Sequence, residues 1–241
     1  MDKSGLAMEA ARLFTEKDGV SAVTRQIGSI KITDVRIREN AARRIGKSAG
    51  RYITLEGEPF DEGMAALLRR AVLQLIVERG RLFVAGLGNP DITADSLGAK
   101  VVRGLTVRKT RRFSLSAIET DVAAKTGLDT AKLVRAAARE IPAECVIAVD
   151  ALSCGNPRYI GKTVQITDAG IALGSGVGSR KSELSRRGLG VPVAAIGVPT
   201  VTALSYVTKN SADSSFLITT ADSDVLVKQW AEVISGALDG L

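Results

Sequence analysis

The sequence of 241 residues contains no histidine. This absence excludes catalysis by a Ser-His-Asp triad or a Cys-His pair, and it excludes the usual zinc sites that need histidine ligands. Acid–base chemistry in this chain must therefore come from carboxylates, lysines, tyrosines or thiols.

Cysteines and aromatic residues are also scarce. The two cysteines, Cys145 and Cys154, lie nine positions apart, which matches neither a Cys-x-x-Cys redox motif nor a zinc knuckle, so we expect reduced thiols. Aromatic residues make up only 4% of the chain. The core must then be built from aliphatic side chains, a composition that suits helices packed on a central sheet.

Long apolar runs are missing as well. No stretch approaches the ~18 uninterrupted apolar residues that a membrane span needs, and the first six residues do not resemble a signal peptide. We therefore expect a cytoplasmic protein with no membrane partner. With 45% hydrophobic residues, the chain is expected to form a single domain over residues 1–241.

Positive charge is what the sequence has in excess, with a formal net charge of +7. The basic residues gather in three clusters, which are Arg36, Arg38, Arg43, Arg44, Lys47 and Arg51, then Arg103, Arg108, Lys109, Arg111 and Arg112, then Arg180, Lys181, Arg186 and Arg187. Such clusters neutralise nucleic-acid phosphates, steer acidic proteins, or form a merely solvated surface. Because no aromatic residues alternate with them to stack on bases, direct nucleic-acid binding is not expected.

Hydrophobic periodicity predicts strands that alternate with helices along the chain. The expected helices cover residues 5–14, 62–78, 95–102, 130–140 and 223–238, and the expected strands cover residues 30–37, 52–55, 81–85, 146–149, 163–166 and 193–196. We expect the strand at 163–166 to be exposed. The pattern indicates an α/β fold, in which a three-layer α/β/α sandwich surrounds a mostly parallel central sheet.

Two aspartates, Asp95 and Asp150, are the best candidates for acid–base chemistry because each follows an apolar strand-like run. Ligands of open α/β sheets bind outside the carboxyl ends of the strands. Taken singly, each aspartate is more typical of a helix N-cap. Taken together, two such carboxylates share one proton, so that one is an acid while the other accepts a proton from water.

Two glycine-rich segments lie near these aspartates in the sequence. Residues 86–91 lack the third glycine of a dinucleotide fingerprint, and residues 174–182 do not fit a phosphate loop. We expect the second segment to be a loop that closes over an extended substrate, although Ser175 or Ser179 with Lys181 is an alternative Ser-Lys dyad. The residues expected to line the site are Gly86, Gly88, Asn89, Thr93, Ser153, Gly174, Ser175 and Gly176.

Several runs of this sequence resemble the pattern of one known family. Residues 86–89 and 93–99 are similar to its Gly-Leu-Gly-Asn and Thr-Pro-Asp-Ala-Leu-Gly-Pro, and residues 149–152 are similar to its Ile-Asp-Ala-Leu. Residues 163–179 are similar to its Thr-Ile-Gln-Ile-x-Asp-Thr-Gly-Ile-x-Pro-Gly-Ser-Gly-Val-Gly-Asn, and residues 189–201 match nearly throughout. In these motifs, which occur in order over essentially the whole chain, the sequence resembles the germination protease (spore endopeptidase) family of spore-forming bacteria.

The resemblance implies a fold akin to hydrogenase maturation proteases and a homotetramer located in the spore core or forespore. It implies that the substrates are the small acid-soluble proteins that coat spore DNA. The two aspartates of the family motifs are its proposed catalytic pair, and they correspond to Asp95 and Asp150. The family's Ala-Ala-Arg after the second aspartate is replaced by residues 153–155, Ser-Cys-Gly.

The prediction is therefore an aspartate-dependent endopeptidase that uses neither a cofactor nor a metal. Two alternatives stay open. One is a non-catalytic basic module that binds spore DNA or its coat proteins. The other is a metal-dependent peptidase that uses the same aspartates as oxygen ligands for a hard cation.

Overall fold

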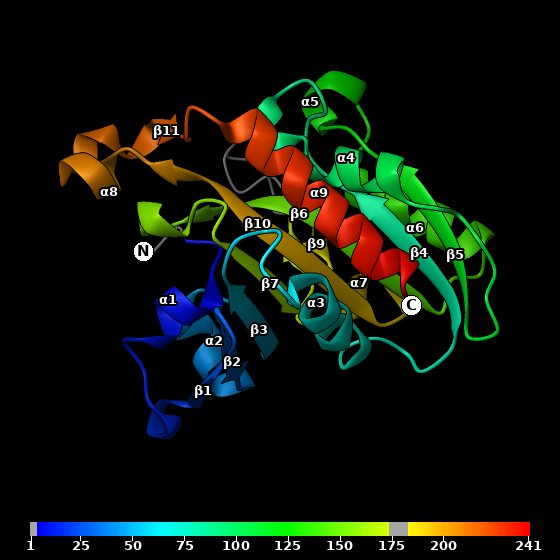
Figure 1. The fold of residues 1–241 in the computed structure, drawn as a ribbon, viewed down its shortest axis with the longest axis horizontal. Coiled ribbons are helices and arrows are strands. Elements are labelled where there is room, and N and C mark those ends of the chain that lie inside the picture. The colour runs from blue at the N-terminus through cyan, green and yellow to red at the C-terminus, as the bar shows by residue number, and fades with distance from the viewer. Residues whose placement is uncertain (1–3, 174–182) are drawn as a thin grey trace.

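The computed structural model describes residues 4–173 and 183–241, and its central feature is one large sheet (Figure 1). In spatial order, the strands along this sheet are β1 (Val20–Ile27), β2 (Ile30–Ile37), β3 (Gly50–Glu56), β7 (Thr163–Thr167), β10 (Val193–Ala203), β6 (Cys145–Cys154), β4 (Gly80–Gly86) and β5 (Phe113–Glu119). A short strand, β11 (Leu217–Ile218), pairs with β10 in addition. A separate two-stranded sheet joins β8 (Ile171–Ala172) to β9 (Glu183–Leu184).

The sheet is mixed, and its parallel half carries the candidate site. Strands β10, β6, β4 and β5 pair in parallel, whereas the neighbouring pairs from β1 to β10 are antiparallel. These pairings direct β1 and β3 the same way as the four parallel strands, while β2, β7 and β11 run in the opposite direction. The carboxyl ends of β4, β5 and β6 therefore meet at one edge.

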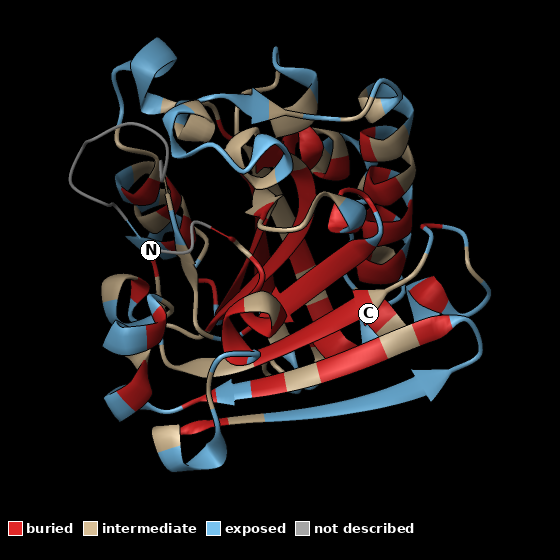
Figure 2. Cartoon of the chain, turned by 90° about the vertical axis from the view of Figure 1, so that its left-hand side faces the viewer, coloured by how far each residue is buried: buried red, intermediate tan, exposed pale blue. Residues whose placement is uncertain are grey.

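Helices cover both faces of the sheet. On one face, α3 (Met64–Leu73), α4 (Leu97–Gly104) and α9 (Ser223–Asp239) pack their apolar sides on the strands around Trp230, which is fully buried. On the other face, α6 (Thr130–Glu140) and α7 (Arg186–Leu189) cover the parallel half, and α1 (Ala7–Ala11) and α2 (Glu39–Ile45) cover the antiparallel half (Figure 1). Figure 2 shows the resulting buried strands, with the outer strand β1 exposed along most of its length.

The remaining elements are single turns or short helices. They are η1 (Glu16–Asp18), η2 (Thr93–Asp95), α5 (Ala123–Thr126), η3 (Pro157–Tyr159), α8 (Ser205–Thr208) and η4 (Ser211–Ser215). Within the described ranges, no helix has both the length and the apolar character needed to cross a membrane.

The predicted fold class, an α/β protein with a mostly parallel central sheet flanked by helices, is confirmed. The bounds predicted for β2 and α6 match those of the structure. The prediction that residues 163–166 form an exposed strand is wrong, because all five residues of β7 are buried between β3 and β10. The helix predicted over 62–78 is shorter, since α3 ends at Leu73. Strands β1 and β5 were not predicted.

Candidate functional site

Asp150 lies within β6, directly after the residue that pairs with the end of β4, and β6 continues four residues beyond it to Cys154. It belongs to β6 itself, whereas the sequence pattern placed it just beyond that strand. The preceding residue, Val149, pairs with Gly86 at the end of β4, and its carbonyl accepts a 2.8 Å hydrogen bond from the Leu87 amide. The end of β4 is therefore fixed directly beside Asp150.

Asp95 reaches the same edge through the loop that follows β4. It is the last residue of the η2 turn, not part of the first turn of α4 as the sequence pattern predicted. Its carboxylate does not cap α4, because Ser96 holds the N-cap position. Instead, the backbone amide of Asn89 donates a 2.7 Å hydrogen bond to Asp95 Oδ2. The side chain is thus held by the loop that follows β4.

Glycines let this loop and α4 approach the strands closely. Gly88 has a φ of +99°, and a Cβ atom there would clash with the Asp95 carbonyl. A Cβ at Gly86 would meet the backbone of Gly98 in α4. These contacts give a physical reason for glycine at positions 86 and 88, which the sequence analysis placed in the site.

The electrostatic environment of the two aspartates distinguishes them. Burial, and after it the negative charge of Asp95, raises the pKa of Asp150 to about 8. The pKa of Asp95 is also raised, first by burial and then by the charge of Asp121, although the Asn89 amide opposes this shift. Each carboxyl is therefore influenced by another carboxyl nearby. Near neutral pH this arrangement favours a proton on Asp150.

The other residues predicted to line the site occupy different positions. Thr93 is exposed at the start of η2, and its carbonyl accepts a hydrogen bond from the Ser96 hydroxyl. Ser153 lies in β6 three residues beyond Asp150, so strand alternation directs it to the opposite face. Three further residues, Gly174, Ser175 and Gly176, fall outside the described residues, as does the alternative pair of Ser179 with Lys181.

Sequence reasoning missed a third acidic residue at this edge, Asp121, which follows β5. Its position is fixed because Thr120 donates hydrogen bonds from both its amide and its hydroxyl to the Gly86 carbonyl, each 2.9 Å long. Asp121 forms an ion pair of 2.6 Å with Lys125 in α5. The signal was present in the sequence, since Asp121 follows a partly alternating run, Phe-Ser-Leu-Ser-Ala-Ile-Glu at 113–119.

Metal and thiol chemistry have less support among the described residues. In that part of the chain, no three Cys, Asp or Glu side chains are grouped closely enough to hold a metal ion. Both cysteines are free and buried. Burial, with a smaller contribution from the charge of Glu9, raises the pKa of Cys154 to about 12, so this thiol stays protonated.

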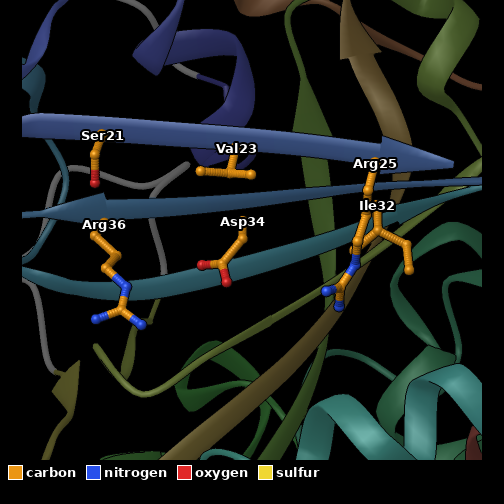
Figure 3. Close-up of a pocket in the computed structure, with 6 residues that line it drawn as sticks. All are labelled: Ser21, Val23, Arg25, Ile32, Asp34 and Arg36. Carbon is orange, nitrogen blue, oxygen red and sulfur yellow. The ribbon is translucent and has the colours of Figure 1, made fainter.

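Two surface hollows lie away from the aspartates. One of about 390 Å³ is lined by Glu78, Arg79, Arg111 and Arg112, which precede β4 and β5 at the opposite edge of the sheet. The other, of about 200 Å³, lies on the outer strands. Figure 3 shows its lining side chains, which are Ser21, Val23 and Arg25 from β1 and Ile32, Asp34 and Arg36 from β2.

Comparison with known proteins places these motifs in a family. A germination protease from Clostridium tetani is 32% identical over 250 residues, which covers 92% of this chain and 77% of the relative. Germination proteases from Caldanaerobacter subterraneus and Priestia megaterium are each 34% identical, over 83% of this chain and over 68% and 60% of their own lengths. Among solved structures, a nickel-iron hydrogenase maturation protease from Thermococcus kodakarensis aligns with a TM-score of 0.41 and 19% identity, over 69% of this chain and 97% of that chain.

The family model for germination proteases matches residues 7–221. This range includes both motifs that carry Asp95 and Asp150. The match covers most of the chain and agrees with the identities to curated relatives. The chain therefore belongs to the germination protease family.

Proposed function

We propose that this protein is an aspartate-dependent endopeptidase that degrades small acid-soluble spore proteins during germination. Family membership supports peptidase activity. The observation that carries the aspartate assignment is that β6 and the η2 turn bring Asp150 and Asp95 to the same edge of the sheet, where burial and the negative charge of Asp95 raise the pKa of Asp150 to about 8. Such a pair keeps one carboxyl protonated and the other ionised at the same pH.

In the proposed mechanism, Asp95 is the base and Asp150 is the acid. The Asp95 carboxylate takes a proton from water, and the water oxygen attacks the scissile carbonyl carbon. Asp150 gives its proton to the carbonyl oxygen, which forms a neutral tetrahedral diol. When the carbon–nitrogen bond breaks, the leaving amine takes the proton from Asp95, and Asp150 recovers its proton from the diol hydroxyl.

By the same family resemblance we propose that the chain assembles as a homotetramer in the cytoplasm of the spore core or forespore. The small acid-soluble proteins are its proposed protein partners. Analytical ultracentrifugation of the purified protein tests the assembly. A monomer at all concentrations would contradict the proposed tetramer without affecting the assignment of the aspartates.

The test of the proposed activity uses Asp95→Asn and Asp150→Asn. An amide is almost isosteric with a carboxyl but does not exchange a proton with water, so each variant should lose cleavage by roughly 10³-fold, at the scale of a lost acid–base group. The double variant should be little worse than either single variant, because residues that act as a unit are strongly non-additive. Cleavage of a small acid-soluble protein is followed by mass spectrometry, and circular dichroism checks that each variant folds.

The same assay separates the two alternatives. Cleavage that survives a chelator favours the aspartate pair, whereas cleavage lost with chelator and restored by a divalent cation favours a metal-dependent peptidase. Binding of the substrate without cleavage favours a non-catalytic module. Wild-type turnover by either Asn variant would remove that aspartate from the proposed mechanism.

A further inference from the structure

Lys125 connects the loops that follow β4 and β5 at the edge where the two aspartates lie. Its ammonium group is 2.6 Å from Asp91 Oδ2 and 2.6 Å from Asp121 Oδ2. It also donates a longer hydrogen bond of 3.4 Å to Asn89 Oδ1. A single lysine therefore contacts three side chains from two loops.

The loop that Lys125 contacts is the one that holds Asp95. The side-chain oxygen Oδ1 of Asn89 accepts a 3.0 Å hydrogen bond from the backbone amide of Asp91, and the backbone amide of Asn89 donates one to Asp95 Oδ2. A continuous chain of contacts thus runs from Lys125 through Asn89 to the Asp95 carboxylate. Movement of Asn89 would remove the one amide that the described residues place on this carboxylate.

Lys125 also balances a charge that acts on Asp95. The negative charge of Asp121 raises the pKa of Asp95, while the hydrogen bond from Lys125 is the largest cause that holds the pKa of Asp121 below its usual range. The Asp121 side chain is only 22% exposed, so water screens it incompletely. Without the lysine, Asp95 would face an uncompensated carboxylate.

We infer that Lys125 is a positioning residue that sets the geometry and charge of Asp95 through Asn89 and Asp121. This inference rests on the proposed function, in which Asp95 is the base. Lys125 is 39% exposed, and ion pairs of exposed side chains contribute little to stability. The expected effect of Lys125 is therefore on turnover, while the folded state is retained.

The test compares Lys125→Met with Lys125→Arg and with a matched control, Lys31→Met. Lys31 forms one ion pair of 2.7 Å with Glu56 and is 40% exposed, against 39% for Lys125, but it lies on β2 away from the aspartates. Lys125→Met should lower kcat about tenfold or more with little change in KM, since a misplaced base affects the chemical step. Lys125→Arg should recover most of the lost turnover, and Lys31→Met should behave as wild type.

A spectroscopic measurement at fixed pH gives a readout that needs no substrate. In a proton–nitrogen NMR spectrum, the backbone amide proton of Asn89 should resonate at low field in the wild type, because it is donated to a carboxylate. It should move upfield in Lys125→Met and in Asp95→Asn, and stay in place in Lys31→Met. An unchanged Asn89 signal and unchanged kcat in Lys125→Met would overturn the inference.

The two measurements also separate this inference from the proposed function. If Asp95→Asn abolishes cleavage but Lys125→Met has wild-type kcat, the inference fails and the proposed function stands. If Asp95→Asn retains wild-type turnover, the proposed function fails first, and the role assigned to Lys125 in catalysis fails with it.

Discussion

At the scale of single residues, Asp150 is the side chain whose ionisation matters most for stability. A carboxyl has a pKa of 3.8 in the unfolded chain, whereas burial and the charge of Asp95 raise that of Asp150 to about 8 in the folded protein. Between these pH values the folded state holds a proton that the unfolded state has released. The stabilisation linked to this proton is complete below pH 4 and is lost as the pH rises to about 8.

We therefore expect Asp150→Asn to stabilise the protein at neutral pH while it abolishes the proposed activity. The amide carries no charge to bury, so the free energy of unfolding at pH 7 should rise by about 2 kcal/mol. This figure is well below the free energy that corresponds to the whole pKa shift, because the side chain is partly exposed to water. The gain should shrink toward pH 4. Urea denaturation of both proteins at several pH values measures it.

Asp18, an aspartate whose pKa is lowered in the folded protein, is the control for this experiment. Backbone and side-chain hydrogen bonds from Thr15, followed by one from Arg44, lower the pKa of Asp18. Asp18→Asn should therefore destabilise the protein at neutral pH and have less effect in acid. If both substitutions changed stability equally at every pH, the raised pKa of Asp150 would not be the cause.

At the scale of elements, the contact between α4 and the strands β4 and β6 holds the candidate site together. Gly98 lies at this contact, and a Cβ there would come within 2.5 Å of the Val149 carbonyl oxygen and clash with the Leu87 backbone. Both neighbours are backbone atoms, of β6 and of the residue directly after β4, and they cannot rotate away as a side chain can. The helix itself would have to move, and η2 with Asp95 would move with it.

Gly98→Ala should accordingly lower the free energy of unfolding by about 3 kcal/mol, at the upper end of overpacking costs. Cleavage should fall as well, because Asp95 is displaced. The matched control is Gly236→Ala in α9, where an added Cβ meets nothing within 4 Å. Alanine at that helical position should stabilise the protein by about 0.5–1 kcal/mol. Equal stabilisation by both substitutions would show that α4 can shift without cost.

The elements also show what the sequence could and could not predict. Periodicity located β2 and α6 because apolar residues recur along both elements, although the two ends of β2 pack in different core clusters. It also located β7, but the predicted exposure of that strand is wrong because Gln165 is polar yet buried. That side chain accepts a hydrogen bond from the Ala7 amide and donates one to the Gly5 carbonyl, at the other end of the chain. No local pattern reveals a partner 158 residues away.

The sequence likewise predicted some residues of the candidate site and missed others. Motif positions singled out Asp95 and Asp150, because strand ends can be identified from apolar runs. Asp121 was missed since β5 has few large apolar residues and was not recognised as a strand. The contacts of Lys125 depend on the meeting of two loops, which only the folded chain defines.

At the scale of the whole molecule, the net charge is +7, and most basic side chains within residues 4–173 and 183–241 are exposed. Some of the basic residues are balanced locally, as Arg44 is by Asp18 and Arg103 is by Glu119. Around the larger hollow, three arginines accompany one glutamate. This distribution leaves a positive surface that attracts acidic proteins and raises their rate of association.

We expect kcat/KM on an acidic protein substrate to fall several-fold as salt rises from about 0.05 M to 0.5 M, with kcat nearly constant. Exposed charges are screened beyond a Debye length of ~8 Å at physiological ionic strength and over shorter distances at higher salt, so the encounter slows while the chemical step is unaffected. Stopped-flow kinetics with a labelled substrate measure the two parameters separately. An uncharged peptide that contains the same cleavage site is the control, because its association has no charge to screen. If salt slowed both substrates equally, or neither, the basic clusters would be only a solvated surface.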